Sequence, residues 1–141
     1  MLDGENVYDL VKRAAAARQQ AYVPYSAFPV GAALLTRSGK IYTGCNVENA
    51  SFGLTVCAER VAIWKAVSEG ETEFEALAVV TNIAGSPCGA CRQVMVEFAP
   101  DMPVVLADLS GIDTITSVDN LLPHAFRPEH LQEAARVAGQ P

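Results

Sequence analysis

The sequence has little positive charge and no long apolar run. Only 10 of its 141 residues are Lys or Arg, against 16 Asp and Glu, which gives a net charge of −6. Because binding to phosphates depends on clustered basic side chains, this composition argues against DNA, RNA and phosphorylated nucleotides as partners. No apolar segment approaches the roughly 20 residues of a membrane span. We therefore expect a small, uncharged ligand, no nucleic-acid partner and no membrane partner.

Export signals and internal divisions are also lacking. Near its start the chain carries Asp3 and Glu5, with no basic region leading into an apolar stretch. We therefore expect no signal peptide and a soluble, cytoplasmic protein. Half of the residues are hydrophobic (50%), enough for an ordinary core, and no linker, repeat or low-complexity tract interrupts the chain. The sequence predicts a single domain over residues 1–141.

Helical and strand patterns alternate along the chain. Apolar residues recur at helical spacing over 6–20, and 30–36 and 41–46 read as two strands of a hairpin. Further strands are expected at 76–82, 103–107 and 115–118, and further helices at 57–69, 88–98 and 129–137. This order predicts an α/β protein with a mixed sheet and helices against its faces. The strand–helix–strand succession around Cys88 favours a parallel pair joined by a right-handed crossover.

The cysteines are the most informative residues present. Cys88 and Cys91 have C-x-x-C spacing, which lets one turn of chain grip a metal ion, and Cys57 can supply a third thiolate. Zinc with three protein ligands keeps one position open for water. A C-x-x-C pair alone can also be a pair of buried thiols or a redox pair. Cys45 lies in an apolar strand-like stretch, and we expect it to be a packed structural cysteine.

A glutamate accompanies the third cysteine. Glu59 lies two residues after Cys57, close enough to a metal there to move the protons of a bound water without being a ligand. Cys57 and Cys88 both fall at expected helix N-termini, where free amide donors stabilise thiolates. These residues together predict a hydrolytic zinc site rather than a structural one.

The Cys-x-Glu…Pro-Cys-x-x-Cys pattern of this chain is typical of zinc deaminases. Three further segments accompany it: Pro24-Tyr25-Ser26, Phe28-Pro29-Val30-Gly31-Ala32-Ala33 and Asn46-Val47-Glu48-Asn49-Ala50. On these motifs, the chain resembles the short-chain cytidine deaminases from about Val7 to Leu131. This resemblance implies a three-layer α-β-α sandwich around a five-stranded mixed sheet, one Zn²⁺ per subunit and a homotetramer with shared sites. The implied reaction is hydrolytic deamination of cytidine and 2′-deoxycytidine, with release of ammonia, in pyrimidine salvage.

The resemblance also assigns roles to individual residues. It makes Glu59 the catalytic proton carrier. Asn46 and Glu48 alternate along a strand end, so their side chains should point the same way; read alone they can be a polar turn, but the resemblance implies that they bind the ribose. Phe28 is expected to stack on the base or to line the pocket around it, or else to belong to the core. Ala58 can offer its backbone N–H to the pyrimidine carbonyl.

Two further predictions concern charge and assembly. Three thiolates on a zinc dication leave net negative charge, which Arg60 can offset by donating to ligand sulfurs; otherwise it is an exposed helix residue. The tail through Phe126 resembles the family's tail, which implies that Phe126 reaches the base in an adjoining subunit. A tail folded on its own core is the alternative. His124 and His130 are expected to be solvated or packing residues.

Three other readings compete with the nucleoside hydrolase. A deaminase of another cytosine-containing small molecule, such as blasticidin S, would share the zinc motif but need not share the segment 46–51. A non-catalytic binding module could hold a structural zinc with Cys45 as fourth ligand, but Cys45 and Cys57 lack paired spacing and Glu59 would have no purpose. A nucleic-acid-editing deaminase is disfavoured by the charge and by the lack of an added basic or aromatic platform.

Overall fold

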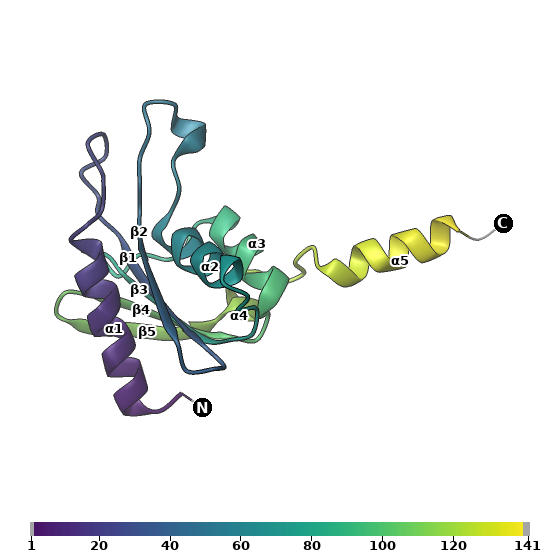
Figure 1. Cartoon of the computed structure of the whole chain (residues 1–141), viewed down its shortest axis with the longest axis horizontal. Helices are drawn as coiled ribbons and strands as arrows, with labels where there is room; N and C mark the ends of the chain where they lie inside the picture. The colour runs from purple at the N-terminus through teal and green to yellow at the C-terminus, as the bar shows by residue number, and fades with distance from the viewer. Residues whose placement is uncertain (1, 140–141) are drawn as a thin grey trace.

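The computed structural model describes residues 2–139, which form one five-stranded sheet with helices on both faces (Figure 1). The strands are β1 (Gly31–Thr36), β2 (Ile41–Cys45), β3 (Phe74–Val80), β4 (Pro103–Asp108) and β5 (Gly111–Ser117). The helices are α1 (Gly4–Arg18), α2 (Ala58–Ser68), α3 (Gly89–Phe98), α4 (Val118–Leu121) and α5 (Pro128–Ala138), with a 3-10 turn η1 at Phe52–Leu54.

The sheet has the strand order β2-β1-β3-β4-β5 and is mixed. β3 and β4 are parallel, whereas the other neighbouring pairs are antiparallel. Parallel neighbours cannot be joined by a tight turn, and α3 provides the crossover between them. The predicted hairpin and the predicted parallel pair are both confirmed. The loop that leads from β3 into α3 carries Cys88, so the topology brings this cysteine to the side where the parallel strands β3 and β4 have their carboxyl ends.

Two apolar clusters lie on the two faces of the sheet. Val7, Leu10 and Ala14 of α1 pack on one face, where Ala33 and other small β1 and β3 side chains leave room. The other face is covered by α2 and α3, and its cluster includes the fully buried Leu34, Ile63, Leu77, Met95 and Val104. Because both faces are covered, β1 and β3 read as nearly continuous apolar runs. The three-layer α-β-α sandwich is confirmed.

Two glycines let the helices lie directly on the strand backbone. A Cβ on Gly44 of β2 would lie 2.5 Å from the carbonyl oxygen of Ala58 and 2.7 Å from the amide nitrogen of Ala62, both in α2. A Cβ on Gly31 of β1 would lie 1.9 Å from the carbonyl oxygen of Ala14 in α1. The absence of a side chain at Gly44 therefore sets the depth at which the start of α2 sits.

Most element boundaries lie within two residues of those predicted from the sequence. The fifth strand is the exception, because β5 spans 111–117 and not 115–118. Its side chains are largely exposed, as befits an edge strand, so it has little of the apolar alternation that reveals a strand in a sequence. Val118 instead starts the short helix α4, whose N-cap Ser117 accepts a hydrogen bond from the amide of Asn120.

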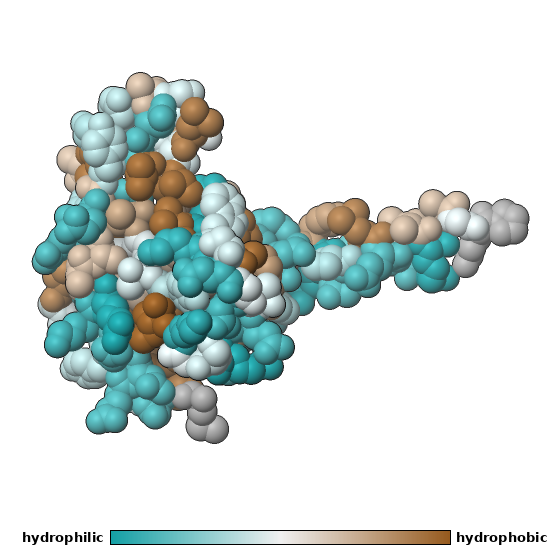
Figure 2. All heavy atoms as spheres, in the orientation of Figure 1, coloured by the Kyte–Doolittle hydropathy of each residue, from teal (hydrophilic) through white to brown (hydrophobic). Residues whose placement is uncertain are grey.

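The last helix projects away from the rest of the molecule (Figure 1). None of the described residues of α5 is buried, and Leu131 and Val137 are exposed. One side of α5 is hydrophobic and the opposite side is hydrophilic (Figure 2). This helix therefore presents an amphipathic surface that the rest of the chain does not cover. Within residues 2–139, none of the helices combines the length and the apolar character needed to cross a membrane.

Candidate metal centre

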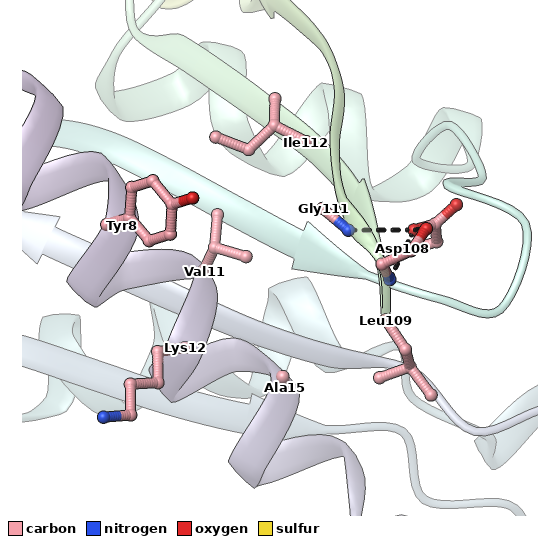
Figure 3. A pocket seen from close by; sticks show the side chains of 9 residues that line it. Tyr8, Val11, Lys12, Ala15, Asp108, Leu109, Gly111 and Ile112 are labelled. Atoms are coloured by element: carbon pink, nitrogen blue, oxygen red, sulfur yellow. Dashed lines mark hydrogen bonds between the residues drawn. The ribbon is translucent and has the colours of Figure 1, made fainter.

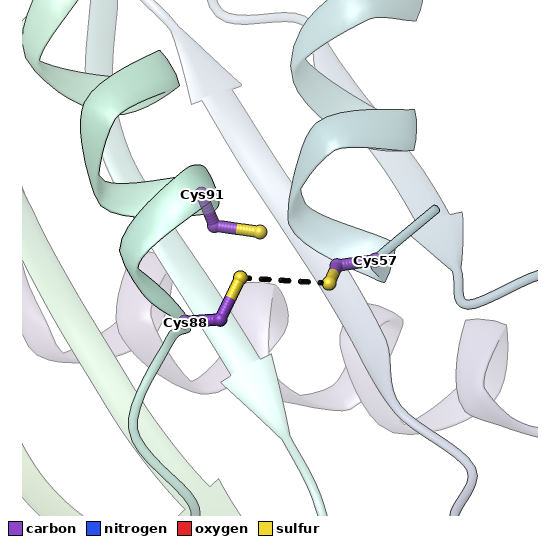
Figure 4. Close-up of side chains that lie close together, drawn as sticks. All are labelled: Cys57, Cys88 and Cys91. Atoms are coloured by element: carbon purple, nitrogen blue, oxygen red, sulfur yellow. Dashed lines mark hydrogen bonds between the residues drawn. The ribbon is translucent and has the colours of Figure 1, made fainter. Parts of the chain in front are cut away.

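Three cysteine thiols meet where the N-termini of α2 and α3 approach each other. Cys57 immediately precedes α2, Cys88 immediately precedes α3, and Cys91 lies in the first turn of α3. Their three Sγ atoms all lie within 4.8 Å of one another (Figure 4). The Sγ atoms of Cys57 and Cys88 are 3.7 Å apart. Thus the tertiary structure brings together the three residues that the sequence singled out.

This arrangement fits a zinc ion. Tetrahedral zinc with Zn–S bonds of about 2.3 Å separates its sulfur ligands by about 3.8 Å, close to the observed 3.7 Å between Cys57 and Cys88. All four cysteines are free thiols. Cys45 ends β2 and is half-buried, and it does not belong to the group of three. The group therefore offers three protein ligands and leaves a fourth position for a non-protein ligand.

The thiols share protons unequally in the metal-free chain. The pKa of Cys57 is lowered to about 5, mainly because the Cys91 thiol donates to its sulfur and also because Arg60 donates to it. The pKa of Cys91 is raised, because its proton is held by this hydrogen bond and the residue is buried. Zinc binds thiolates, so binding must release the protons that remain. Zinc binding at this site therefore weakens as the pH falls.

Glu59 lies in the first turn of α2 with only 4% of its surface exposed. Burial, with a smaller contribution from the nearby Cys57 thiolate, raises its pKa to about 7. A carboxyl that gains and loses a proton near neutral pH is suited to general acid–base catalysis. Its position beside the thiols lets it act on a molecule bound at the fourth position.

Arg60 extends from α2 toward the ligand sulfurs. Its Nη2 donates to Sγ of Cys57 over 3.4 Å. The guanidinium carbon also lies 5.9 Å from the centre of the Trp64 ring. The hydrogen bond to the Cys57 thiolate raises the pKa of Arg60, so its positive charge is retained. This charge offsets part of the negative charge that three thiolates bring.

A cavity of about 360 Å³ opens beside the three thiols. Cys57, Cys88 and Glu59 line it, together with the half-buried Phe28 and the buried Asn46. Its volume is in the range of small-molecule sites. Among the residues that line it in the described part of the chain, none is Lys or Arg. The cavity thus suits a compact neutral molecule that reaches both the metal ligands and the buried carboxyl.

Asn46 holds residues 28–30 in place at the wall of this cavity. Its Oδ1 accepts from the backbone N–H of Val30 at 2.8 Å, and its Nδ2 donates to the carbonyl oxygen of Phe28 at 2.9 Å. One hydrogen on Nδ2 is left for another acceptor. Asn46 therefore shapes the wall that contains Phe28 and retains one donor for a ligand.

Glu48 lies in a neighbouring hollow with Tyr25 and Ser26. Its carboxylate accepts from the backbone N–H groups of Tyr25 at 3.0 Å and Ser26 at 3.1 Å, and from the Ser26 hydroxyl. The Ser26 hydroxyl is the main cause of the lowered pKa of Glu48. In this conformation Glu48 anchors the turn before Phe28, and it does not line the same cavity as Asn46.

Ala58, Phe126 and the histidines occupy different environments. Ala58 is fully buried as the first residue of α2, where helix N–H groups lack helical acceptors. Phe126 is 57% exposed, and its ring centre lies 5.6 Å from that of His130. It does not line the cavity of its own chain. His130 accepts from the N–H of Arg127 through Nδ1, and neither His130 nor His124 belongs to the metal-binding group.

Thr81 is a site residue that the sequence did not reveal. It is buried, lines the cavity and follows β3. Its Oγ1 accepts from the backbone N–H groups of Gly85 at 2.7 Å and Ile83 at 3.3 Å. It thereby fixes the loop that leads to Cys88. The only sequence signal was a hydroxyl residue at the start of a Gly-containing loop, which is common in turns that have no catalytic role.

A second hollow of about 390 Å³ lies between α1 and the turn from β4 to β5 (Figure 3). Its wall is formed largely by apolar parts of Tyr8, Val11 and Ile112. The Asp108 carboxylate at its edge accepts from Ser110 and Gly111 of the turn. This second hollow lies on the α1 side of the sheet, whereas the thiols lie on the α2 and α3 side. Its described lining offers no reactive group comparable to the thiols. The cysteine-lined cavity remains the candidate functional site.

Comparisons with known proteins agree with this geometry. The family model described as the cytidine and deoxycytidylate deaminase zinc-binding region matches residues 5–107. A cytidine deaminase of Sporosarcina psychrophila is 55% identical over 133 residues, covering 92% of this chain and 98% of the relative. A cytidine deaminase of Halalkalibacterium halodurans is 52% identical over 127 residues, covering 88% of this chain and 96% of the relative.

A solved structure is also similar. The crystal structure of cytidine deaminase from Burkholderia pseudomallei matches with a TM-score of 0.81 and 52% identity, covering 84% of this chain and 98% of that one. The predicted zinc cofactor thus agrees with the family and with the fit of the three thiols. The chain belongs to the cytidine and deoxycytidylate deaminase family, whose zinc-binding region its residues 5–107 match.

Proposed function

We propose that this protein is a zinc-dependent hydrolase that converts cytidine and 2′-deoxycytidine to uridine and 2′-deoxyuridine with release of ammonia. The proposal rests on one observation: a single cavity is lined by two of the three candidate metal ligands, Cys57 and Cys88, and by the buried carboxyl of Glu59. Relatives at 55% and 52% identity that are named cytidine deaminases support it. We place the reaction in pyrimidine salvage in the cytoplasm.

The proton chemistry falls to Glu59. Zinc held by Cys57, Cys88 and Cys91 would supply a Lewis acid that lowers the pKa of water at the open position toward about 7. The Glu59 carboxylate accepts a proton from the attacking water as the C4–O bond forms, and delivers it to N3 of the ring. It then transfers the second proton of that water to the 4-amino group. The C4–N bond breaks, ammonia departs and N3 keeps its proton, so one water is consumed for each ammonia released.

The remaining wall supports a nucleoside as substrate. The free hydrogen on Nδ2 of Asn46 can donate to a ribose hydroxyl, and the spare lone pairs of Glu48 can accept from one if its carboxylate turns toward the cavity. Phe28 lines the cavity and offers an apolar surface to the base. The N–H of Ala58, at the N-terminus of α2, suits the pyrimidine carbonyl. A 5′-phosphate would find no cation in the lining and would meet the negative charge of Glu48.

We further propose a homotetramer in which each site is completed by another subunit. Phe126 is 57% exposed and does not line the cavity of its own chain, which leaves much of its ring available to a neighbour. The uncovered apolar side of α5 supports association of the same kind. Light scattering and truncation after Asp119 test this proposal. We expect a tetramer that loses activity together with assembly, and a fully active native monomer would rule out shared sites.

One assay separates the substrate hypotheses. Protein of known zinc content is incubated with cytidine, deoxycytidine, cytosine, CMP and blasticidin S, and the loss of the 4-amino group is followed. We expect turnover of the two nucleosides and poor turnover of cytosine and CMP. Efficient deamination of blasticidin S alone would favour the antibiotic as substrate. Zinc-loaded protein without activity on any of the five would support a structural zinc site.

A further inference from the structure

The two side chains that follow Cys91 hold the segment 121–126, here called the tail segment, against helix α3. All three guanidinium nitrogens of Arg92 donate. Nη1 donates to the carbonyl oxygen of Leu121 at 2.6 Å, Nε to that of Pro87 at 2.7 Å, and Nη2 to the hydroxyl of Ser86 at 2.8 Å. Arg92 therefore contacts both the residues just before Cys88 and the start of the tail segment.

Gln93 holds the other end of the tail segment. Its Nε2 donates to the carbonyl oxygen of Phe126 at 2.7 Å. Between the two ends, Ala125 is buried in the core cluster on the α2 and α3 side, and Leu122 packs against that cluster. The tail segment is thus fixed at both ends by polar contacts and in the middle by apolar ones. One turn of α3 carries a metal ligand and both polar contacts.

The chemistry of Arg92 explains why this junction is rigid. A guanidinium group is planar and presents its donors in fixed directions, so three acceptors that match it are held in one relative arrangement. An ammonium group at the same position is a single point on a flexible stem and cannot reach all three acceptors. Because Pro87 is bonded directly to Cys88, displacing the tail segment must strain or release the chain that positions this ligand.

We propose that Arg92 and Gln93 are positioning residues that couple the metal centre to the tail segment, so that zinc binding orders the tail and an ordered tail tightens zinc binding. The coupling is reciprocal, because each event must change the other by the same factor at equilibrium. This inference deepens the proposed function, on which it rests: the tail carries Phe126, which we place at the site of a neighbouring subunit. Metal occupancy would then also control what the chain presents to its neighbours.

The test measures zinc affinity and tail order without substrate. Zinc dissociation constants are obtained by competition with a chromophoric chelator. Amide hydrogen exchange of the tail segment is measured with and without zinc in the wild type, Arg92→Lys, Gln93→Leu and Glu97→Gln. The last is the control, because Glu97 is an exposed residue one turn beyond Gln93 in α3, and its side chain makes no hydrogen bond to the described tail segment.

We expect zinc to slow exchange in the wild-type tail by at least tenfold. Arg92→Lys should weaken zinc binding by about tenfold or more and remove most of the zinc-dependent difference, and Gln93→Leu should reduce that difference near Phe126. Glu97→Gln should leave both quantities within twofold of wild type. A merely structural role would instead raise exchange equally in the two metal states.

Two results would overturn the proposal: tail exchange in the wild type that does not respond to zinc, or Arg92→Lys protein that keeps wild-type zinc affinity. The first requires no variant, so the proposal stays testable even if Arg92→Lys fails to fold. Neither measurement uses the reaction. Zinc-coupled tail order in a protein that deaminates none of the substrates would refute the proposed function and leave this coupling standing.

Discussion

Replacing Gly44 by alanine should displace the metal-bearing end of α2. The added Cβ would lie 2.5 Å from the carbonyl oxygen of Ala58, whereas ordinary contacts begin near 3.4 Å. The difference, 3.4 − 2.5, means that the helix must move outward by roughly 0.9 Å. Neither partner can rotate away, because the nearest atoms of Ala58 and Ala62 belong to the helix backbone.

The displacement affects both stability and metal binding. Overpacking of a core contact costs about 1–3 kcal/mol. Cys57 immediately precedes the displaced turn, and a metal site tolerates only about 0.2 Å of error in its ligand distances. We therefore expect zinc affinity to fall by at least roughly tenfold, equivalent to about 1.4 kcal/mol. Zinc bound to the folded state adds to its stability, and weaker binding removes part of that addition. The substitution should therefore destabilise zinc-loaded protein more than metal-free protein.

Urea unfolding of metal-free and zinc-loaded protein, together with chelator competition, measures both effects. Gly31→Ala is the matched control, because its Cβ would lie 1.9 Å from the carbonyl oxygen of Ala14 in α1, on the opposite face of the sheet. It should destabilise the protein at least as much while leaving zinc affinity nearly unchanged. Wild-type zinc affinity in Gly44→Ala, or an equal loss of affinity in both variants, would refute the reasoning.

Four further predictions concern the site itself. Cys91→Ser should lose stoichiometric zinc and activity, whereas Cys45→Ser should retain zinc; elemental analysis decides, and zinc loss from the Cys45 variant would indicate a four-cysteine structural site. Glu59→Gln should keep zinc while kcat falls by roughly 10²–10⁴-fold or more, and a variant within tenfold of wild type would remove Glu59 from the mechanism. Arg60→Gln should shift the pH–rate profile to higher pH and depress activity most at neutral or lower pH, and superimposable profiles would leave Arg60 without an electrostatic role. Because burial raises the pKa of Glu59 from 4.5 to about 7 in the metal-free chain, the protonated form is favoured on folding. The contribution of protonated Glu59 to the free energy of unfolding is fully present below pH 4.5 and is lost as the pH rises through about 7. Metal-free wild type should therefore lose roughly 3 kcal/mol relative to Glu59→Gln between these limits, and parallel stability profiles would contradict the burial of a titrating carboxyl.

Local patterns in the sequence were sufficient for most of the fold. The hairpin, the parallel pair and the α3 crossover were all predicted, because apolar periodicity and turn residues act over a few positions. The edge strand β5 and the four-residue helix α4 were mispredicted or missed, since neither buries enough apolar surface to leave a clear pattern.

The side chains around the site show where local reasoning ends. Period-two alternation predicted that Asn46 and Glu48 point the same way, and both side chains do reach one segment, residues 25–30. The alternation continues past the end of β2, where Val47 forms bridges with Tyr22 and Val56. The sequence did not reveal that both side chains bond to the protein's own backbone, because those bonds depend on the fold of residues 25–30.

By itself the sequence determined the metal chemistry and the order of the elements. The spacing of Cys88 and Cys91, and of Glu59 from Cys57, is a property of neighbouring positions that any fold would retain. Only the tertiary structure decided which distant groups meet: the pairing of α2 with α3 and the junction of Arg92 with Leu121 join residues with no local relation in the chain. Such contacts form because packing both faces of the sheet brings distant segments together, and hydrogen bonds then fix those segments in register.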